Sequence, residues 1–328
     1  MPILALDLRR NQNPVRERDM KSRKRPFQKD IVIHCYQRSK DGGLLFYCYS
    51  DYLVWFTIIC IVASRHKVTI LAMCPMPDHV HISLRAASAK ELSGFIGEAS
   101  SWYAVRFNQV CKTEGHVFEP RFGSAPKYGT KRGRTNILYV CNNPVERQLV
   151  QNAEDYRWTF LAYAVSEHPF SKKLIIRKAS RAMQKAVREV KAQFKAGLPL
   201  TYAQLQRLFA SLSHEECLQL TDFIITTYNV IDYDAALEFF DSYEDLLKAA
   251  HATTSKEHDI NEVFVGKSDA HYSKMASTIM RELKPADIHD VLSLPPAEKY
   301  EIFQLLRKHS DAMSEQIAKF LHMPVTKL

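Results

Sequence analysis

Two histidines separated by one residue follow an apolar segment of the chain. His79 and His81 flank Val80, and the extended pattern continues to Leu84. Side chains of a strand alternate between two faces, so both imidazoles project from one face and Val80 from the other. Imidazole is a common ligand of divalent metals. The spacing therefore predicts a strand that carries half of a metal site on one face.

A tyrosine and an asparagine lie close together in a second segment, residues 136–144. Tyr139 and Asn143 are four residues apart, so they share one face of a predicted helix that Pro144 ends or kinks. Brought over the histidine pair, the Asn143 amide oxygen would give a metal its third ligand, with the Tyr139 phenol beside it as a nucleophile. Tyr103 is a rival nucleophile, but its position in an apolar helical pattern favours core packing.

Both segments carry motifs of a known family. Residues 76–81, Met-Pro-Asp-His-Val-His, and residues 139–144, Tyr-Val-Cys-Asn-Asn-Pro, resemble the motifs of the HUH single-tyrosine nucleases. They are most similar to those of the REP-associated tyrosine transposases, and the resemblance spans roughly residues 31–165. The chain departs from that family in a basic arm before this region and in about half of its length after it.

The resemblance implies a metal-dependent transposase or endonuclease that cleaves and rejoins single-stranded DNA next to repeat hairpins. Tyr139 would be the catalytic residue and would form a 5′-phosphotyrosine. The metal would be Mg²⁺ or Mn²⁺, held by His79, His81 and Asn143, because imidazole ligands disfavour Ca²⁺. The partner would be single-stranded DNA with hairpin repeats.

Strands and helices alternate through the first half of the chain. Strands are predicted over residues 31–36, 44–49, 67–74 and 79–85, the first two as a hairpin, with helices over residues 51–66 and 88–111. A further strand and loop are expected over residues 116–128. This order favours an α+β fold, a ferredoxin-like antiparallel sheet with helices on one face, which the resemblance also implies. An all-helical C-terminal region follows.

Charge and helical pattern divide the chain into four expected regions. Residues 1–29 are a predicted flexible basic arm, residues 30–165 the HUH domain, residues 166–197 a basic linker helix, and residues 198–328 an acidic helical domain ending in a partial helix-turn-helix. Residues 166–197 hold nine Lys and Arg against two Asp and Glu, whereas residues 198–328 hold 12 against 20. Phosphate attraction dominates nucleic-acid affinity, so the basic regions indicate the DNA surface.

Six basic residues of the HUH domain are candidates for DNA contact. Aromatic residues interleave with several of them, a pattern typical of proteins that bind single-stranded DNA. The candidates are Arg38, Arg121, Lys127, Lys131, Arg132 and Arg134.

Cysteine spacing and hydropathy indicate the cellular compartment of the protein. Its seven cysteines form no CxxC pair, which argues against a disulfide framework or a zinc cluster and favours the reducing cytoplasm. The apolar run over residues 52–63 is too short to cross a bilayer. We therefore expect a cytoplasmic protein without membrane contact, and a monomer is favoured.

Two other functional classes remain open. A hairpin-binding regulator with weak or lost cleavage would be expected to lack one of His79, His81 and Tyr139, and all three are present. A replication initiator or relaxase of the HUH type would show a third histidine after the pair or a second tyrosine in the nucleophile helix. Only Tyr139 occupies that helix.

Overall fold

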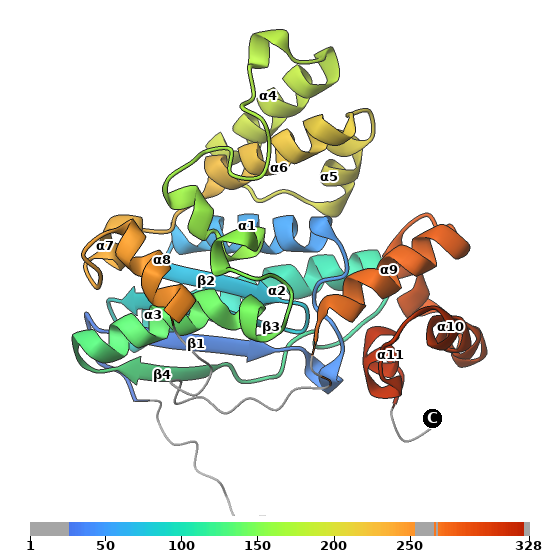
Figure 1. Ribbon diagram of the computed structural model, residues 1–328, viewed down its shortest axis with the longest axis horizontal. Coiled ribbons are helices and arrows are strands. Elements are labelled where there is room, and N and C mark those ends of the chain that lie inside the picture. The colour runs from blue at the N-terminus through green and yellow to red at the C-terminus, as the bar shows by residue number, and fades with distance from the viewer. Residues whose placement is uncertain (1–25, 253–265, 267, 325–328) are drawn as a thin grey trace, which may run out of the picture.

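A four-stranded antiparallel sheet forms the centre of the protein. The computed structural model describes residues 26–252, 266 and 268–324, so most of the arm predicted over residues 1–29 falls outside the described residues. The strands are β1 (Val32–Arg38), β2 (Val68–Met76), β3 (His79–Ala86) and β4 (Gly123–Lys127), in the order β2-β3-β1-β4 (Figure 1). Both neighbours of β1 are antiparallel to it. This is the strand order of a ferredoxin-like sheet, as predicted.

Two helices cover one face of the sheet. The helices α1 (Tyr49–Ala63) and α2 (Ala89–Cys111) share a hydrophobic core with Val80, Ile82 and Leu84 of β3. The alternation of β3 thus directs its apolar side chains towards these helices.

A third helix covers the opposite face. The helix α3 (Gly129–Glu146) packs Ile137 and Val140 into a second core with Cys74 and Met76 of β2. It therefore lies over the face from which His79 and His81 project. The prediction of helices on one face is correct for α1 and α2, whereas α3, the helix that carries Tyr139, covers the opposite face.

Residues 44–48 form an irregular buried segment instead of the strand predicted over residues 44–49. Leu44, Leu45 and Phe46 are all at most 3% exposed, and the last two donate backbone hydrogen bonds to the Pro77 carbonyl oxygen at 2.7 and 3.0 Å. The predicted hairpin cannot form because β3 and β4 already occupy both edges of β1. Consecutive rather than alternating burial distinguishes this segment from a half-buried strand.

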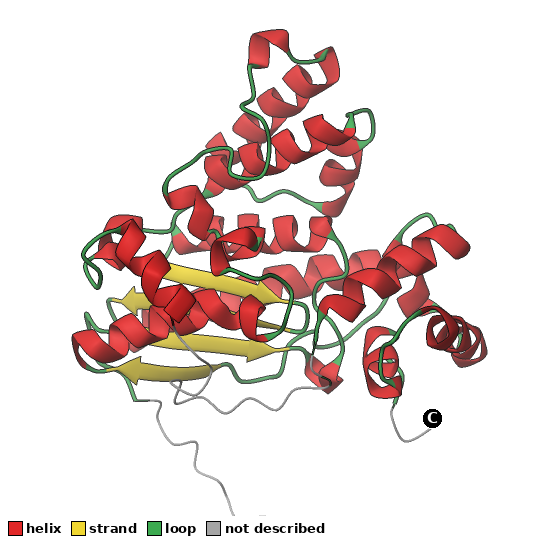
Figure 2. Ribbon diagram, in the orientation of Figure 1, coloured by secondary structure: helices red, strands yellow, loops and turns green. Residues whose placement is uncertain are grey.

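Three helices form a projection above α1. The helices α4 (Arg181–Lys195), α5 (Tyr202–Phe209) and α6 (His214–Tyr228) lie on the side of α1 that faces away from the sheet (Figure 2). The basic linker helix predicted over residues 166–197 begins only at Arg181. Asp222 of α6 accepts hydrogen bonds from the Phe170 backbone and the Ser171 hydroxyl, which holds the preceding segment in an irregular path, with one 3-10 turn at Ile176–Lys178.

The remaining helices pack on the core from two other sides. Two short helices, α7 (Tyr233–Leu237) and α8 (Tyr243–Ala252), follow α6, and α8 contacts α3. A 3-10 segment (Ile288–Ser293) contacts α2, and it lies against α9 (Ala270–Glu282). The helices α10 (Pro296–His309) and α11 (Ser314–Phe320) end the described chain. The domain boundaries and the partial helix-turn-helix stay predictions. No helix among the described residues is long and apolar enough to cross a membrane.

A buried ion network joins the 3-10 segment to the start of α1. Asp51 accepts hydrogen bonds from the Tyr202 hydroxyl at 2.6 Å and from His289 Nε2 at 2.9 Å. The other ring nitrogen of His289 lies 2.5 Å from Asp287 Oδ1. Burial alone would lower the pKa of His289, but the two carboxylates outweigh it and raise that pKa to about 10. His289 is therefore charged at neutral pH.

The network predicts a loss of stability at alkaline pH. The folded pKa of His289 is about 10, above the roughly 6.5 of an unfolded histidine. Its contribution is therefore complete below about pH 6.5 and declines as the pH rises through the folded value. We expect the urea-unfolding free energy of the wild type to fall more steeply over this window than that of His289→Gln. Parallel curves for the two proteins would contradict the charged state of His289.

Candidate active site

The two histidines predicted as ligands and the predicted nucleophile come together between the sheet and α3. The rings of His79 and His81 lie 4.7 Å apart between centroids, and the Tyr139 ring lies 5.3 Å from that of His81. All three side chains are buried, with Tyr139 only 3% exposed. The strand alternation and the placement of α3 over β3 thus produce the predicted grouping.

A third histidine, which the sequence did not single out, belongs to the same cluster. His34 of β1 places Nε2 3.0 Å from Nδ1 of His81, and its ring centroid lies 5.4 Å from that of Tyr139. In the sheet, His34 is paired with Ser83 and Tyr36 with His81, so His34 and His81 are diagonal neighbours. The signal for His34 in the sequence was a histidine among the apolar residues of a predicted strand. Its place in the cluster could be recognised only from the β1–β3 register.

Burial keeps two of these histidines neutral. Desolvation, with the charge of Lys127, lowers the pKa of His34 to about 3. Desolvation and the neighbouring His79 hold the pKa of His81 well below its ordinary value. Neutral imidazole is the form that binds a metal, so the environment favours the ligand state of His81 at physiological pH.

A carboxylate orients the first histidine of the pair. Asp78 Oδ1 lies 2.6 Å from Nδ1 of His79, and the other carboxylate oxygen forms an ion pair with Lys319 of α11. Burial opposes ionisation of Asp78, but His79 and Lys319 outweigh it and keep the pKa of this carboxyl far below its ordinary value. Because Nδ1 of His79 is directed to Asp78, Nε2 is the nitrogen that would face a metal.

Two asparagines line the same helix. The side-chain nitrogen of Asn143 donates a hydrogen bond to the Tyr139 carbonyl oxygen at 2.8 Å, so the amide oxygen is the atom that suits a cation. One turn before Tyr139, Asn136 is 2% exposed, and its amide makes no hydrogen bond within the described residues. A buried amide of this kind is uncommon and suits a polar ligand.

By their chemistry, the three predicted ligands would suit a divalent metal. Two imidazole nitrogens and one amide oxygen, from His79, His81 and Asn143, match Mn²⁺ or a tolerant Mg²⁺ better than Ca²⁺. Both histidines have an outer partner on Nδ1, as metal-binding histidines usually do.

A second group of possible ligands does not fit a metal. Cys48, Asp51 and His289 offer ligand atoms within 4.8 Å of one another. However, both nitrogens of His289 face carboxylates, and Asp51 also accepts hydrogen bonds from the Tyr47 and Cys48 backbone at 2.7 and 3.0 Å. A charged imidazole already takes the place of a cation in this network.

Five of the six candidate DNA-contacting residues lie on β1, on or just before β4, and in the first turn of α3. Arg38 is the strand partner of His79, Lys127 ends β4, and Arg121 is exposed just before β4. Lys131 and Arg132 are exposed in the first turn of α3, where the helix dipole also favours phosphate.

Arg134 and Tyr103 have structural partners. The Arg134 guanidinium donates to Asp245 at 3.0 Å and to the Phe239 carbonyl oxygen at 2.9 Å, which favours a role in packing α8 over DNA contact. Tyr103 is fully buried, and its hydroxyl donates to the Leu45 carbonyl oxygen at 2.6 Å. The core position expected for Tyr103 is therefore the one observed.

Comparisons with known proteins match part of the chain. Residues 50–143 match the family model described as IS200-like transposase. A solved structure of a REP-associated tyrosine transposase bound to a REP hairpin is similar over 44% of this chain and 86% of that chain, with 18% identity and a TM-score of 0.39. No curated protein gives a significant match. Residues 50–143, which carry His79, His81 and Tyr139, thus match the model of the IS200-like transposase family, in agreement with the resemblance read from the two motifs.

Proposed function

We propose that this protein is a metal-dependent transposase or endonuclease that cleaves and rejoins single-stranded DNA next to repeat hairpins. The observation that carries the proposal is the placement of the Tyr139 ring against His34 and His81, with His79 beside them. His79, His81 and Tyr139 lie within the segment that matches a transposase family. A phenol beside a metal-binding histidine pair suits phosphoryl transfer to tyrosine.

The reaction follows from the groups present. The Tyr139 oxygen attacks the scissile phosphorus, the bond to the 3′-oxygen breaks, and the phenol loses its proton while the leaving 3′-oxygen gains one. A free tyrosine has a pKa of about 10 and is a weak nucleophile at neutral pH. A Mg²⁺ or Mn²⁺ bound by His79, His81 and Asn143 would offset the charge on the phosphate. The phosphotyrosine is a phosphodiester, so a second 3′-hydroxyl can displace Tyr139 without ATP.

Access to Tyr139 requires movement. Its side chain is 3% exposed, so a scissile phosphate reaches the phenol only when α3 or a neighbouring segment shifts. Coupling such a shift to DNA binding would restrict cleavage to bound substrate.

The direct test uses single-stranded oligonucleotides drawn from repeats that flank the gene. We expect a covalent protein–DNA species on denaturing gels with Mn²⁺ or Mg²⁺, and its loss with a chelator. DNA binding without any covalent species, under every metal condition, would instead support the hairpin-binding regulator.

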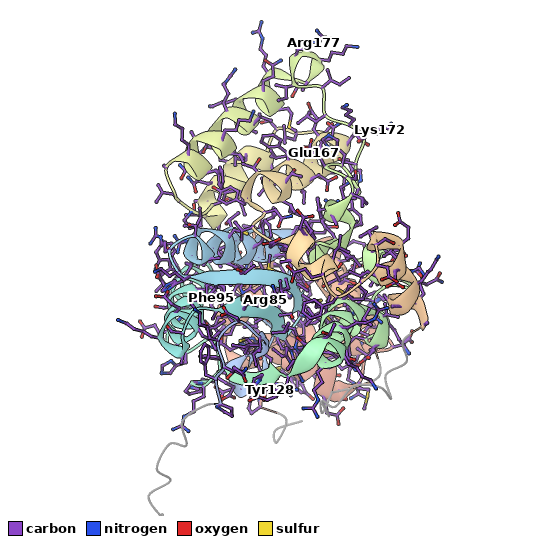
Figure 3. All side chains as sticks on the ribbon, turned by 90° about the vertical axis from the view of Figure 1, so that its left-hand side faces the viewer. Arg85, Phe95, Tyr128, Glu167, Lys172 and Arg177 are labelled. Carbon is purple, nitrogen blue, oxygen red and sulfur yellow. The ribbon has the colours of Figure 1, made fainter. Side chains whose placement is uncertain are left out.

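A basic face on the projection is a candidate for flanking DNA. Its nine Lys and Arg side chains are exposed, and none has an ion pair within the described part of the chain. They are Lys172, Lys173, Arg177, Lys178, Arg181, Lys185, Arg188, Lys191 and Lys195. Lys172 and Arg177 lie at the opposite end of the molecule from Tyr128, which precedes α3 (Figure 3). We infer that this basic face contacts DNA away from the cut.

Neutralising part of the basic face should weaken binding in a salt-dependent way. For Arg181→Gln, Lys185→Gln and Arg188→Gln combined, we expect lower affinity for a long oligonucleotide and a salt slope reduced by about 0.7 per lost phosphate contact. Cleavage of a short oligonucleotide should be unchanged. Lys274→Gln, Lys284→Gln and Lys308→Gln combined, exposed and from the acidic part of the chain, are the charge-matched control. Equal losses in the two triple variants would contradict a dedicated surface.

A further inference from the structure

The last described helix reaches the candidate active site through one side chain. Lys319 of α11 forms an ion pair with Asp78, and Asp78 in turn lies 2.6 Å from Nδ1 of His79. The three side chains are 13%, 20% and 3% exposed, so the chain of contacts is largely shielded from water. Figure 1 shows α11 beside the end of the sheet where β1 finishes.

Packing fixes the position of α11 independently of this ion pair. Ile317, Ala318 and Phe320 are fully buried. The Tyr47 hydroxyl donates a hydrogen bond to the Phe320 carbonyl oxygen at 3.0 Å. Lys319 is therefore held at Asp78 by a docked helix rather than by a mobile tail. It lies far outside the segment, residues 50–143, that matches the transposase family.

We propose that Lys319 is a positioning residue for His79, supplied by α11. The ammonium group holds one oxygen of the Asp78 carboxylate, so the other oxygen accepts the Nδ1–H of His79 and directs Nε2 into the site. A histidine whose Nδ1 is held in this way is fixed in tautomer and ring orientation, which strengthens it as a ligand. The inference rests on the proposed function in one respect, that Nε2 of His79 faces a metal.

The competing explanation is that Lys319 and Asp78 form only a docking contact for α11. The two roles differ in what they affect. A docking contact influences the stability of the C-terminal helices, whereas a positioning contact sets the tautomer of His79 and the metal affinity. Tyr47→Phe provides the matched control, because it removes another hydrogen bond to α11 and leaves Lys319 and Asp78 in place.

The test measures Mn²⁺ affinity and the apo-protein tautomer of His79 in the full chain. Mn²⁺ binding is followed by the electron paramagnetic resonance signal of the free ion, and the tautomer by nitrogen-15 NMR of the imidazoles. We expect Lys319→Met to weaken Mn²⁺ binding about tenfold and to populate the Nε2–H tautomer of His79. Lys319→Arg and Tyr47→Phe should resemble the wild type. Adding Lys319→Met to Asp78→Asn should change little further, because both act through one contact.

The outcomes separate this inference from the proposed function. Unchanged Mn²⁺ affinity and an unchanged His79 tautomer in Lys319→Met would overturn the positioning role, as would equal effects in Tyr47→Phe. If Lys319→Met does not fold, Lys319→Gln takes its place with the same expected loss of Mn²⁺ affinity and the same shift of the His79 tautomer, and Lys319→Arg remains its control. A wild type that binds no Mn²⁺ would contradict the metal site, while the NMR comparison would still test the contact.

Discussion

Replacing Tyr139 with phenylalanine should abolish covalent attachment to single-stranded DNA and leave DNA binding within about twofold. Tyr139→Phe removes only the phenol oxygen, and the ring keeps its edge contacts with His34 and His81, at centroid distances of 5.4 and 5.3 Å. The loss follows because no other group in the cluster combines a nucleophilic oxygen with these two contacts. A 5′-phosphotyrosine retains the DNA fragment on the 3′ side of the cut, so the oligonucleotide is labelled at its 3′ end and resolved on a denaturing gel.

Tyr103→Phe is the control for this experiment. It deletes the same atom from the rival tyrosine, whose hydroxyl bonds to the Leu45 carbonyl oxygen inside the core. The expected consequence is a stability loss of about 1 kcal/mol, with covalent attachment retained. A labelled band that persists in Tyr139→Phe and disappears in Tyr103→Phe would reverse the assignment of the nucleophile.

Local patterns account for the part of the site that was predictable from sequence. The placement of His79 and His81 on one face needs only the period of a strand, and that of Tyr139 and Asn143 only the period of a helix. The fold class followed from the alternation of elements and the family resemblance. None of these inferences requires knowing which distant residues touch.

Contacts between distant segments account for what the sequence did not reveal. His34 joins the cluster through the register of β1 against β3, and Lys319 reaches Asp78 only because α11 docks beside the sheet. Arg134, which was predicted to contact DNA, donates to Asp245 and to the Phe239 carbonyl oxygen, and the sequence did not identify these partners.

The strand wrongly predicted over residues 44–49 has a similar origin. Its apolar residues are buried in the core, and β3 and β4 already occupy both edges of β1. Sequence patterns identify buried residues more readily than they identify the partners of those residues.

Removal of either histidine of the pair should eliminate cleavage. For His81→Ala we expect a loss on the order of 100-fold or more, because the change removes a ligand and also the contacts that His81 makes with His34 and Tyr139. His79→Ala should have a comparable effect, and excess Mn²⁺ should rescue neither fully, since one remaining imidazole cannot hold the ion in the same place. Asn143→Ala should cost less, because water replaces an amide oxygen at a hard cation more readily than it replaces imidazole.

Two measurements are needed to attribute the His81→Ala loss to the metal. Mn²⁺ affinity should fall together with the cleavage rate in His79→Ala and His81→Ala, and circular dichroism should show that both variants remain folded. His116→Ala, which removes an exposed histidine, is the control and should leave both quantities unchanged. If a chelator does not slow cleavage by the wild type, the histidines act without a metal.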